Sequence, residues 1–386
     1  MAQNELRDVS IVGIGQIPIQ KENAHSLKRM GAEVVQLAMK DAGIDQVDAL
    51  FAGNMLADEL QNQKHVATLV ASEAGLRGVE ALQVRAATAT GAAALRMAYF
   101  AVASGEARRA VAVGVEKMSG GEATPALAKA LDAETETAAG ATLLSQNARL
   151  MQIYMDKYDV AVDDFNSFSL NAHRNARTNE NALFKEKKIT WKTVQNSPVI
   201  SPPLRLYDAS PICDGAAAVI LTRSSEARAY TDQPVKILSS SVATDWFRID
   251  DRSDPLYLYA AARSAQEAFR KANIHRNDVD LFEVHDAFSI MACLLLEAVG
   301  YAERGQGWRL AADNQLSLRG SLPVATFGGL KARGHPIGAT ALYQTCEIVL
   351  QLTGKAGKNQ VKNAELALLQ SVGGAASTVL THIFGV

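Results

Sequence analysis

The sequence predicts an α/β protein made of two similar halves, with largely parallel sheets covered by helices. Short apolar, strand-like segments alternate with amphipathic, helix-like segments, which favours this fold class. Two pairs of similar segments recur in the same order, and a more polar stretch lies between them. With 386 residues, 48% of them hydrophobic, the chain is long enough to bury a large core.

The first half opens with a predicted strand at residues 9–13. An amphipathic helix then ends near residues 38–42, where Gly43 provides a left-handed cap, and a buried strand follows at 47–51. Further on, a helix opening at Gly91 leads to the apolar strand 110–114.

The second half repeats this order. A strand at 235–239 precedes an amphipathic helix that ends near 268–272, with Asn273 as its cap, and a buried strand follows at 279–284. A helix opening at Gly338 then leads to a strand at 366–370. Two matched pairs in the same order predict a duplicated βα unit.

These patterns predict the domain boundaries. Residues 1–118 and 204–230 form the N-terminal half, and residues 231–386 form the C-terminal half. Residues 119–203 are more polar, with helical segments and irregular connections. That composition suits a lobe laid over the core and not a third core of its own.

Charge and composition exclude several function classes. The formal net charge is −2, and no basic excess indicates a nucleic-acid partner. The longest apolar run is too short to span a membrane, and the polar first residues do not predict a signal peptide. Cys213, Cys293 and Cys346 are too widely spaced for a metal-ligand pattern or a disulfide framework. The expectation is a soluble, cytoplasmic protein.

Four segments at the ends of predicted strands stand out, because α/β proteins place their sites there. They are Ala86-Ala87-Thr88-Ala89-Thr90-Gly91, Val284-His285-Asp286-Ala287-Phe288, Gly334-His335-Pro336-Ile337-Gly338 and Ser371-Val372-Gly373-Gly374. Together they resemble the active-site blocks of thiolases. The resemblance covers nearly the whole chain, is most specific at residues 328–338, and extends to 201–205, 214–218 and 171–176. The second block, at residues 284–288, resembles the form of this block in sterol-carrier-type and archaeal-type thiolases.

The resemblance implies a thiolase fold, in which two βαβαβαββ halves form a five-layered α/β/α/β/α core under a covering loop lobe. It implies acyl-CoA thioesters as substrates, with no bound cofactor and no metal ion. It also implies a homodimer or a tetramer of paired dimers. The apolar strand at 111–114 would be a poor exposed edge, so we expect a twofold contact to cover it.

His335 matches the family histidine that activates the nucleophilic thiol and donates to the thioester oxygen. Gly334 allows a tight turn before it and Pro336 fixes the backbone after it. A neutral imidazole suits proton transfer near neutral pH. For His285 the resemblance implies an oxyanion-hole donor to the thioester carbonyl, with Phe288 and Ala287 at the substrate tunnel.

The first block departs from the family pattern, because Thr88 stands where thiolases carry the nucleophilic cysteine. A cysteine supplies useful thiolate near neutral pH, whereas a threonine hydroxyl has no comparable ionised fraction. Acyl transfer to Thr88 would also form an oxygen ester, which is harder to discharge to coenzyme A.

The fourth block departs as well, because Ser371 occupies the position of the second, proton-moving cysteine. The alternative position for that cysteine, inside the second block, holds Ala287. We expect Cys293 and Cys346 to be core residues. The backbone N–H of Gly373 is a candidate oxyanion donor.

Three functions follow from this pattern. The first is a thiolase-like acyltransferase acting on acyl-CoA or 3-ketoacyl-CoA thioesters by Claisen or retro-Claisen chemistry. The second is a cysteine-free retro-aldol or decarboxylative lyase acting on a coenzyme A thioester. The third is a non-catalytic subunit that binds acyl-CoA and scaffolds a small zinc-ribbon, OB-fold partner protein, as some members of the superfamily do.

Overall fold

The structure, a computed structural model, describes residues 6–386. The N-terminal half contains β1 (Val9–Gln16), α1 (Leu27–Asp41), β2 (Ala49–Gly53), α2 (Ala57–Leu60), α3 (Val66–Glu73), β3 (Glu80–Val84), α4 (Thr90–Ser104), β4 (Arg109–Glu116), β7 (Gly215–Arg223) and α9 (Ser224–Ala227). The C-terminal half contains β8 (Val235–Thr244), α10 (Tyr259–Ala272), β9 (Leu281–Glu283), α11 (Ser289–Val299), α12 (Gly307–Ala312), α13 (Thr340–Leu352), β10 (Leu366–Gly373) and β11 (Thr378–Gly385). The segment between them contains α5 (Ala123–Ala128), α6 (Leu143–Tyr158), α7 (Asn166–Ala176), α8 (Trp191–Gln195) and the hairpin β5 (Val199–Ser201) with β6 (Leu204–Arg205).

The two halves have the same strand topology, which confirms the predicted duplication. The main sheet runs in the order β3-β2-β4-β7-β1-β8-β11-β10-β9. In each half a parallel pair, β2 with β4 or β9 with β10, is followed by two antiparallel pairings. The halves differ at the outer edge, where an isolated bridge between Phe282 and Val324 stands in place of a strand equivalent to β3.

The helix ends also follow the sequence prediction. Gly43, after α1, has a φ of 65°, and Asn273, after α10, has a φ of 53°. Glycine and asparagine are the residues that tolerate this left-handed backbone, so both helices stop where a strand must begin. β9 is shorter than the apolar run at 279–284, because it pairs in parallel with β10 over three residues.

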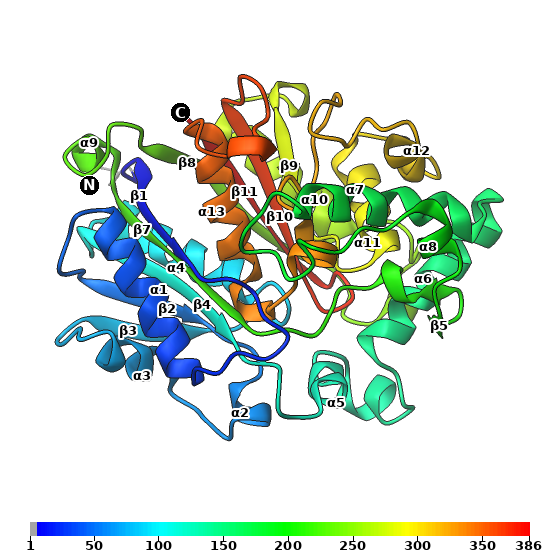
Figure 1. The fold of residues 1–386 in the computed structure, drawn as a ribbon, viewed down its shortest axis with the longest axis horizontal. Helices are drawn as coiled ribbons and strands as arrows, with labels where there is room; N and C mark the ends of the chain where they lie inside the picture. The colour runs from blue at the N-terminus through cyan, green and yellow to red at the C-terminus, as the bar shows by residue number, and fades with distance from the viewer. Residues whose placement is uncertain (1–5) are drawn as a thin grey trace.

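Three apolar clusters define five layers, as expected. One cluster packs α1 and α3 against one face of the N-terminal strands. A second holds α4 and α13 between the N-terminal and the C-terminal strands. A third packs α10 and α11, with α6 and α7 of the lobe, against the far face of the C-terminal strands. Figure 1 shows α13 between the blue-to-cyan strands and the yellow-to-red strands.

The N-terminal ends of α4 and α13 lie side by side in the central layer. A Cβ added to Gly91 would lie 2.7 Å from the carbonyl oxygen of Gly338, and one added to Gly338 would lie 2.6 Å from that of Gly53. Only glycine permits such close backbone approach. The second helix begins later than expected, at Thr340, because residues Ile337–Ala339 form a 3₁₀ turn.

The prediction that the strand at 111–114 forms a sheet edge is wrong. This strand is β4, which pairs with β2 on one side and β7 on the other. Its apolar composition reflects burial on both faces and not an uncovered edge. The edge strand of the N-terminal half is β3, whose Leu82 is 51% exposed. A homodimer remains a prediction, and β3 is the edge available for it.

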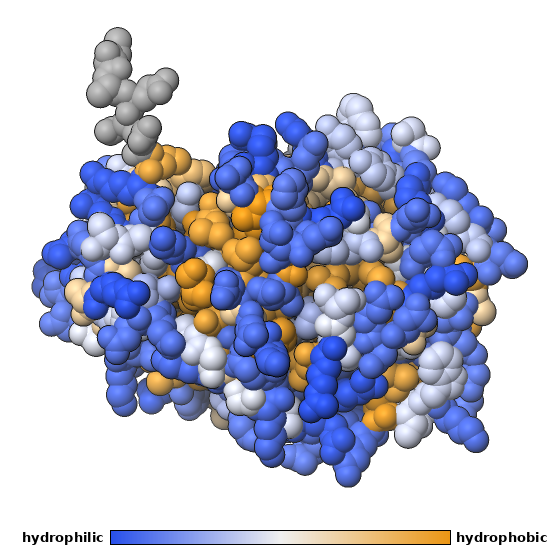
Figure 2. Space-filling model, turned by 90° about the horizontal axis from the view of Figure 1, so that it is seen from above, coloured by the Kyte–Doolittle hydropathy of each residue, from blue (hydrophilic) through white to orange (hydrophobic). Residues whose placement is uncertain are grey.

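Residues between β4 and β7 form the covering lobe over the C-terminal strands (Figure 1). On the face shown in Figure 2 the surface is largely hydrophilic, and apolar residues gather in a central band. No helix within residues 6–386 is long and apolar enough to cross a membrane.

Candidate active site

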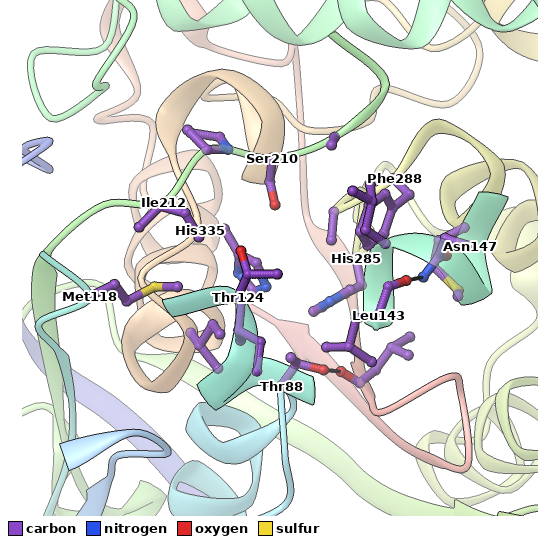
Figure 3. Close-up of a pocket in the computed structure, with 18 of the residues that line it drawn as sticks. Thr88, Met118, Thr124, Leu143, Asn147, Ser210, Ile212, His285, Phe288 and His335 are labelled. Atoms are coloured by element: carbon purple, nitrogen blue, oxygen red, sulfur yellow. Dashed lines mark hydrogen bonds between the residues drawn. The ribbon is translucent and has the colours of Figure 1, made fainter. Parts of the chain in front are cut away.

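A cavity of about 200 Å³ lies where the two halves and the covering lobe meet. Thr88 reaches it from the N-terminal half, and His285 and His335 reach it from the C-terminal half. Leu143 and Asn147 line it from α6 of the lobe (Figure 3). The cavity therefore brings together segments that are far apart in the sequence.

Five of the seven predicted site residues line this cavity: Thr88, His285, Ala287, Phe288 and His335. Ser371 and Gly373 are not among its lining residues, whereas Val372 and Gly374 are. Because successive residues of a strand face opposite sides, β10 presents Val372 to the cavity and directs Ser371 into the interior. The Ser371 hydroxyl is fully buried and has no hydrogen-bond partner among the described residues.

A strained turn before α4 presents Thr88. Ala87 has a φ of 47°, which is unusual for a residue with a side chain. Thr90 holds this turn, because its Oγ1 accepts from the Ala86 N–H at 2.9 Å and donates to the Ala87 carbonyl at 2.7 Å. The turn thereby directs the Thr88 side chain towards the cavity.

The Thr88 hydroxyl is engaged with the backbone. Its Oγ1 donates to the carbonyl oxygen of Val372 at 2.5 Å (Figure 3). The hydroxyl hydrogen therefore points at β10, and no hydrogen bond joins it to His285 or His335. In this geometry the hydroxyl has no hydrogen bond to a base that would activate it as a nucleophile.

His335 follows the turn that sequence analysis singled out. Gly334 has a φ of 120°, and the His335 N–H donates to Cys213 Sγ at 3.2 Å. On the ring, Nδ1 lies 2.7 Å from Thr340 Oγ1, and that hydroxyl in turn donates to the Pro336 carbonyl at 3.3 Å. Because the Thr340 hydroxyl donates its hydrogen to Pro336, its oxygen can only accept from His335 Nδ1. We therefore assign the imidazole proton of His335 to Nδ1, and the lone pair of Nε2 then faces the cavity.

His285 lies directly after β9, with its ring centroid 5.2 Å from that of His335 and the two planes at 88°. Its Nδ1 is buried without a hydrogen-bond partner among residues 6–386, which leaves Nε2 to face the cavity. The next residue, Asp286, accepts a hydrogen bond from the Leu330 N–H at 2.7 Å. This bond fixes the turn that carries His335 against the segment that carries His285.

Both imidazoles are neutral near physiological pH. Burial, together with the positive charge of Arg333, lowers the pKa of His285 to about 3. Burial, together with His285 and Arg333, holds the pKa of His335 well below its usual value. Arg333 itself is fully buried and pairs with Glu347 Oε2 at 3.1 Å. A neutral imidazole can donate one hydrogen bond and accept one proton, which are the two tasks expected here.

Sequence reasoning missed three residues of the site. Ser210 lines the cavity because its N–H donates to the Ala287 carbonyl at 2.8 Å, and its hydroxyl points inward in Figure 3. Asn147 lines the cavity from α6. Cys213 does not line it, but its Sγ accepts the backbone N–H of His335. Ser210 lies between residues 201–205 and 214–218, two segments that carried the family resemblance, and this proximity was the available signal.

All three cysteines are buried and free, and none of them lines the cavity within the described chain. Cys293 and Cys346 belong to apolar clusters, as predicted. Within residues 6–386, no group of three or more His, Cys, Asp and Glu side chains is arranged to hold a metal ion.

Comparison with known families and proteins agrees with the fold. The model for the thiolase N-terminal domain matches residues 9–225, and the model for the thiolase C-terminal domain-like family matches residues 241–386. The chain is 41% identical over 382 residues to the acetyl-CoA acetyltransferase of Methanothermobacter thermautotrophicus, covering 98% of this chain and 100% of that protein. It is 28% identical over 396 residues to human sterol carrier protein 2, covering 97% of this chain and 72% of that protein.

Solved structures share the fold. The Ltp2-ChsH2(DUF35) aldolase aligns with a TM-score of 0.85 at 23% identity, covering 98% of this chain and 97% of that one. An acetyl-CoA acetyltransferase from Syntrophomonas wolfei aligns with a TM-score of 0.77 at 16% identity, covering 99% of both chains. The two family models together span most of the sequence, so this chain belongs to the thiolase family.

Proposed function

We propose that the protein makes or breaks the C2–C3 bond of acyl-CoA thioesters, with His335 as the acid–base residue and His285 as a donor to the thioester oxygen. The observation that carries this proposal is the pair of neutral imidazoles, 5.2 Å apart, at one cavity. An enolate formed at the thioester needs a hydrogen-bond donor at its oxygen and a base at C2 or at the C3 oxygen. His285 Nε2–H and the lone pair of His335 Nε2 supply these two functions.

One version of this chemistry is the acyl transfer that the names of the relatives describe. Thr88 Oγ1 would give its proton to His335 and attack C3 of a 3-ketoacyl-CoA. Cleavage of the C2–C3 bond would release the acetyl-CoA enolate, which takes the proton back from His335. The sulfur of a coenzyme A thiol would then attack the acyl ester and break its bond to Thr88 Oγ1. The thiol proton would pass through His335 to the departing Thr88 oxygen, so that an acyl-CoA and the free hydroxyl are formed. This route requires the Thr88 side chain to leave its hydrogen bond with Val372.

The second version is a retro-aldol cleavage that uses no acyl-enzyme, and the Thr88–Val372 hydrogen bond favours it. Nε2 of His335 takes the proton of a 3-hydroxyl group, and the C2–C3 bond breaks. C3 departs as an aldehyde or ketone, while the bonding electrons form an enolate whose oxygen accepts from His285. The His335 imidazolium then protonates C2, so that acetyl-CoA is released and His335 is neutral again.

Replacing Thr88 by valine separates the two versions, because valine keeps the shape and removes the hydroxyl. Two reactions are followed by coenzyme A ester analysis: thiolysis of acetoacetyl-CoA with coenzyme A, and carbonyl release from a 3-hydroxyacyl-CoA. Acyl transfer through Thr88 predicts thiolysis that Thr88→Val abolishes. Retro-aldol chemistry predicts carbonyl release that Thr88→Val retains. If the wild-type protein binds acetyl-CoA and performs neither reaction, the non-catalytic scaffold is the correct function.

The proposal extends to assembly. We propose a homodimer or a tetramer of dimers, and a small zinc-ribbon, OB-fold partner, in a cytoplasmic location. The name of the Ltp2-ChsH2(DUF35) aldolase includes a second component, which supports testing for a partner of this chain. Light scattering on the purified protein measures its oligomeric state. Co-purification from the native source tests whether a small partner protein binds it.

A further inference from the structure

The outer layer of the C-terminal half contains a groove that is separate from the cavity. It lies between α10 and the end of α11 (Figure 1) and has a volume of about 610 Å³. None of the residues that line it also lines the cavity with Thr88, His285 and His335. The groove is therefore open to a partner whether or not the cavity holds a substrate.

The floor of the groove is apolar. It consists of buried and half-buried side chains from the two helices and from the turn after α10, namely Ala262, Phe269, Ile274, Ala298 and Val299. Tyr259 stands at one end of this floor and is 49% exposed. From Tyr259 to Phe269, α10 runs for about 15 Å, which is about three helical turns. A groove of this length between two helices suits a third helix with one apolar face.

The rim of the groove carries positive charge. Arg263 and Arg276 line the groove and are exposed. On the outer side of the same helix, Arg270 pairs with Glu267 at 2.7 Å, whereas no carboxylate within residues 6–386 pairs with either rim arginine. Among the described residues that line the groove, none is Asp or Glu. An occupant with carboxylates beside its apolar face would therefore complement this rim.

A second copy of this chain does not supply such a helix. Besides α10, only α1 and α4 among the described helices of eight or more residues expose a large apolar side chain, Leu37 and Met97 respectively. One exposed side chain per helix is too few to cover a floor of about three turns. A nucleic acid is disfavoured as well, because the adjoining hollow beyond Tyr259 contains Asp245 and Asp254.

We propose that this groove docks an amphipathic helix of another protein. The apolar row of that helix packs on Ala262 and Phe269, and its acidic residues face Arg263 and Arg276. Burial of the apolar row supplies most of the affinity, while the charges on the rim select the partner. The inference does not depend on the chemistry of the cavity.

Fluorescence anisotropy with labelled peptides tests the proposal on the complete chain. One probe is a helical peptide of the same length as α10, with leucines at i, i+3, i+4 and i+7 and glutamates on both sides of this row. The second probe has lysines in place of the glutamates. We expect the wild-type protein to bind the glutamate peptide about tenfold more tightly, because two exposed ion pairs and the repulsion that replaces them are together worth about that factor.

The double variant Arg263→Glu with Arg276→Glu should reverse this preference and favour the lysine peptide. Arg270→Glu makes the same change of charge on α10 outside the groove, and as the matched control it should keep the wild-type preference. If the double glutamate variant does not fold, Arg263→Gln with Arg276→Gln removes the charges without reversing them and should abolish the preference. An unchanged preference in the folded double variant would overturn the proposal.

A substitution in the floor separates docking from simple attraction between charges. Ala262→Arg fills the floor and adds a cation, so docking predicts that binding of the glutamate peptide is lost. Tighter binding by Ala262→Arg would overturn the proposal, and so would a wild-type protein that binds both peptides equally or neither of them. Single-stranded RNA that displaces the glutamate peptide at a lower concentration than unlabelled peptide does would also overturn it, and would make the groove a site for polyanions.

Discussion

At the residue scale, three atoms determine what the cavity can do: the hydroxyl oxygen of Thr88 and the Nε2 atoms of His285 and His335. The hydroxyl donates to Val372, and both imidazoles are neutral. A base and a donor are therefore available, while the nucleophile is engaged elsewhere. In the proposed function, this pocket therefore stabilises an enolate more readily than it forms an acyl-enzyme.

Thr88→Cys should restore the family nucleophile. A thiol at this position is acidic enough to ionise beside a histidine, so it should become the fastest-alkylated thiol of the protein. Thiolysis of acetoacetyl-CoA should appear or rise by about two or more orders of magnitude. Peptide mapping after brief iodoacetamide treatment and a thiolysis assay measure the two effects.

Adding Ser371→Cys to Thr88→Cys tests the second departure from the family pattern. If Ser371 limits proton transfer, the double variant should exceed the single one, because a positioned acid–base group contributes about 10²–10⁴-fold. The orientation of Ser371 away from the cavity makes this a demanding test. Equal rates for the single and double variants would remove Ser371 from the site.

Removing either imidazole should strongly lower turnover while substrate binding remains. His335→Ala loses the base and His285→Ala loses the oxyanion donor, each with an expected fall in kcat of about 10²–10³. The dissociation constant of acetyl-CoA should change little, since both imidazoles act mainly on charge that develops in the transition state. His275→Ala, at an exposed histidine, is the matched control and should behave as wild type. A His335→Ala enzyme with normal kcat would contradict the assigned role.

The sequence predicted the two histidines, because glycine, proline and aromatic neighbours mark them. It did not predict Asn147, which enters the cavity only because the covering lobe folds back across the core. The sequence also did not predict the hydrogen bond from the His335 N–H to Cys213, since 122 residues separate the two in the chain. Local patterns identify residues within a motif, whereas contacts between distant segments depend on the whole fold.

At the element scale, the abutting ends of α4 and α13 position the two segments that carry Thr88 and His335. Thr88 lies just before α4 and His335 just before the turn that leads into α13. The backbone contact between Gly91 and Gly338 therefore sets how far apart these segments lie. Glu116 reinforces it by accepting the Gly338 N–H at 3.0 Å.

Gly91→Ala tests this contact. Alanine favours a helix by about 1 kcal/mol over glycine, so propensity alone predicts stabilisation. A Cβ at this position would lie 2.7 Å from the Gly338 carbonyl oxygen, and relieving such a clash costs about 1–3 kcal/mol. We expect lower stability in chemical denaturation and lower activity. Ser104→Ala, at the exposed end of the same helix, should be near neutral. A stabilised Gly91→Ala would show that the helix ends are not in close contact.

Element type and order were predictable, because helical and strand periodicities differ and both halves repeat one pattern. The position of β4 within the sheet was not. An apolar strand buried between two neighbours and an apolar edge that awaits a partner subunit have the same composition. The 3₁₀ turn before α13 was also hidden, because it results from the close approach of Gly338 to Gly53.

At the scale of the whole molecule, burial of ionisable groups controls the pH dependence of stability. Burial lowers the pKa of His173 to about 4 and that of His285 and His382 to about 3. It raises the pKa of Glu116 and of Glu283 to about 7. The histidines are therefore neutral in the folded protein at pH values where the unfolded chain protonates them.

The free energy of unfolding should be greatest near about pH 6 and fall on both sides. Below about pH 6.5 the unfolded histidines bind protons that the folded ones exclude, so acidification destabilises the protein. From about pH 4.5 through pH 7, the folded carboxyls retain protons that the unfolded ones release, so raising the pH destabilises it as well. Denaturation midpoints at several pH values measure this profile. A midpoint that rises steadily from neutral to acidic pH would contradict the buried neutral histidines.

The central claim is that His285 and His335 generate a thioester enolate without covalent help from Thr88. Hydrogen–deuterium exchange at the methyl group of acetyl-CoA in D₂O, followed by NMR, measures this step directly. The account predicts exchange by wild-type protein, the same rate for Thr88→Ala, and none for His335→Ala. Exchange that Thr88→Ala abolishes, or that His335→Ala retains, would contradict it.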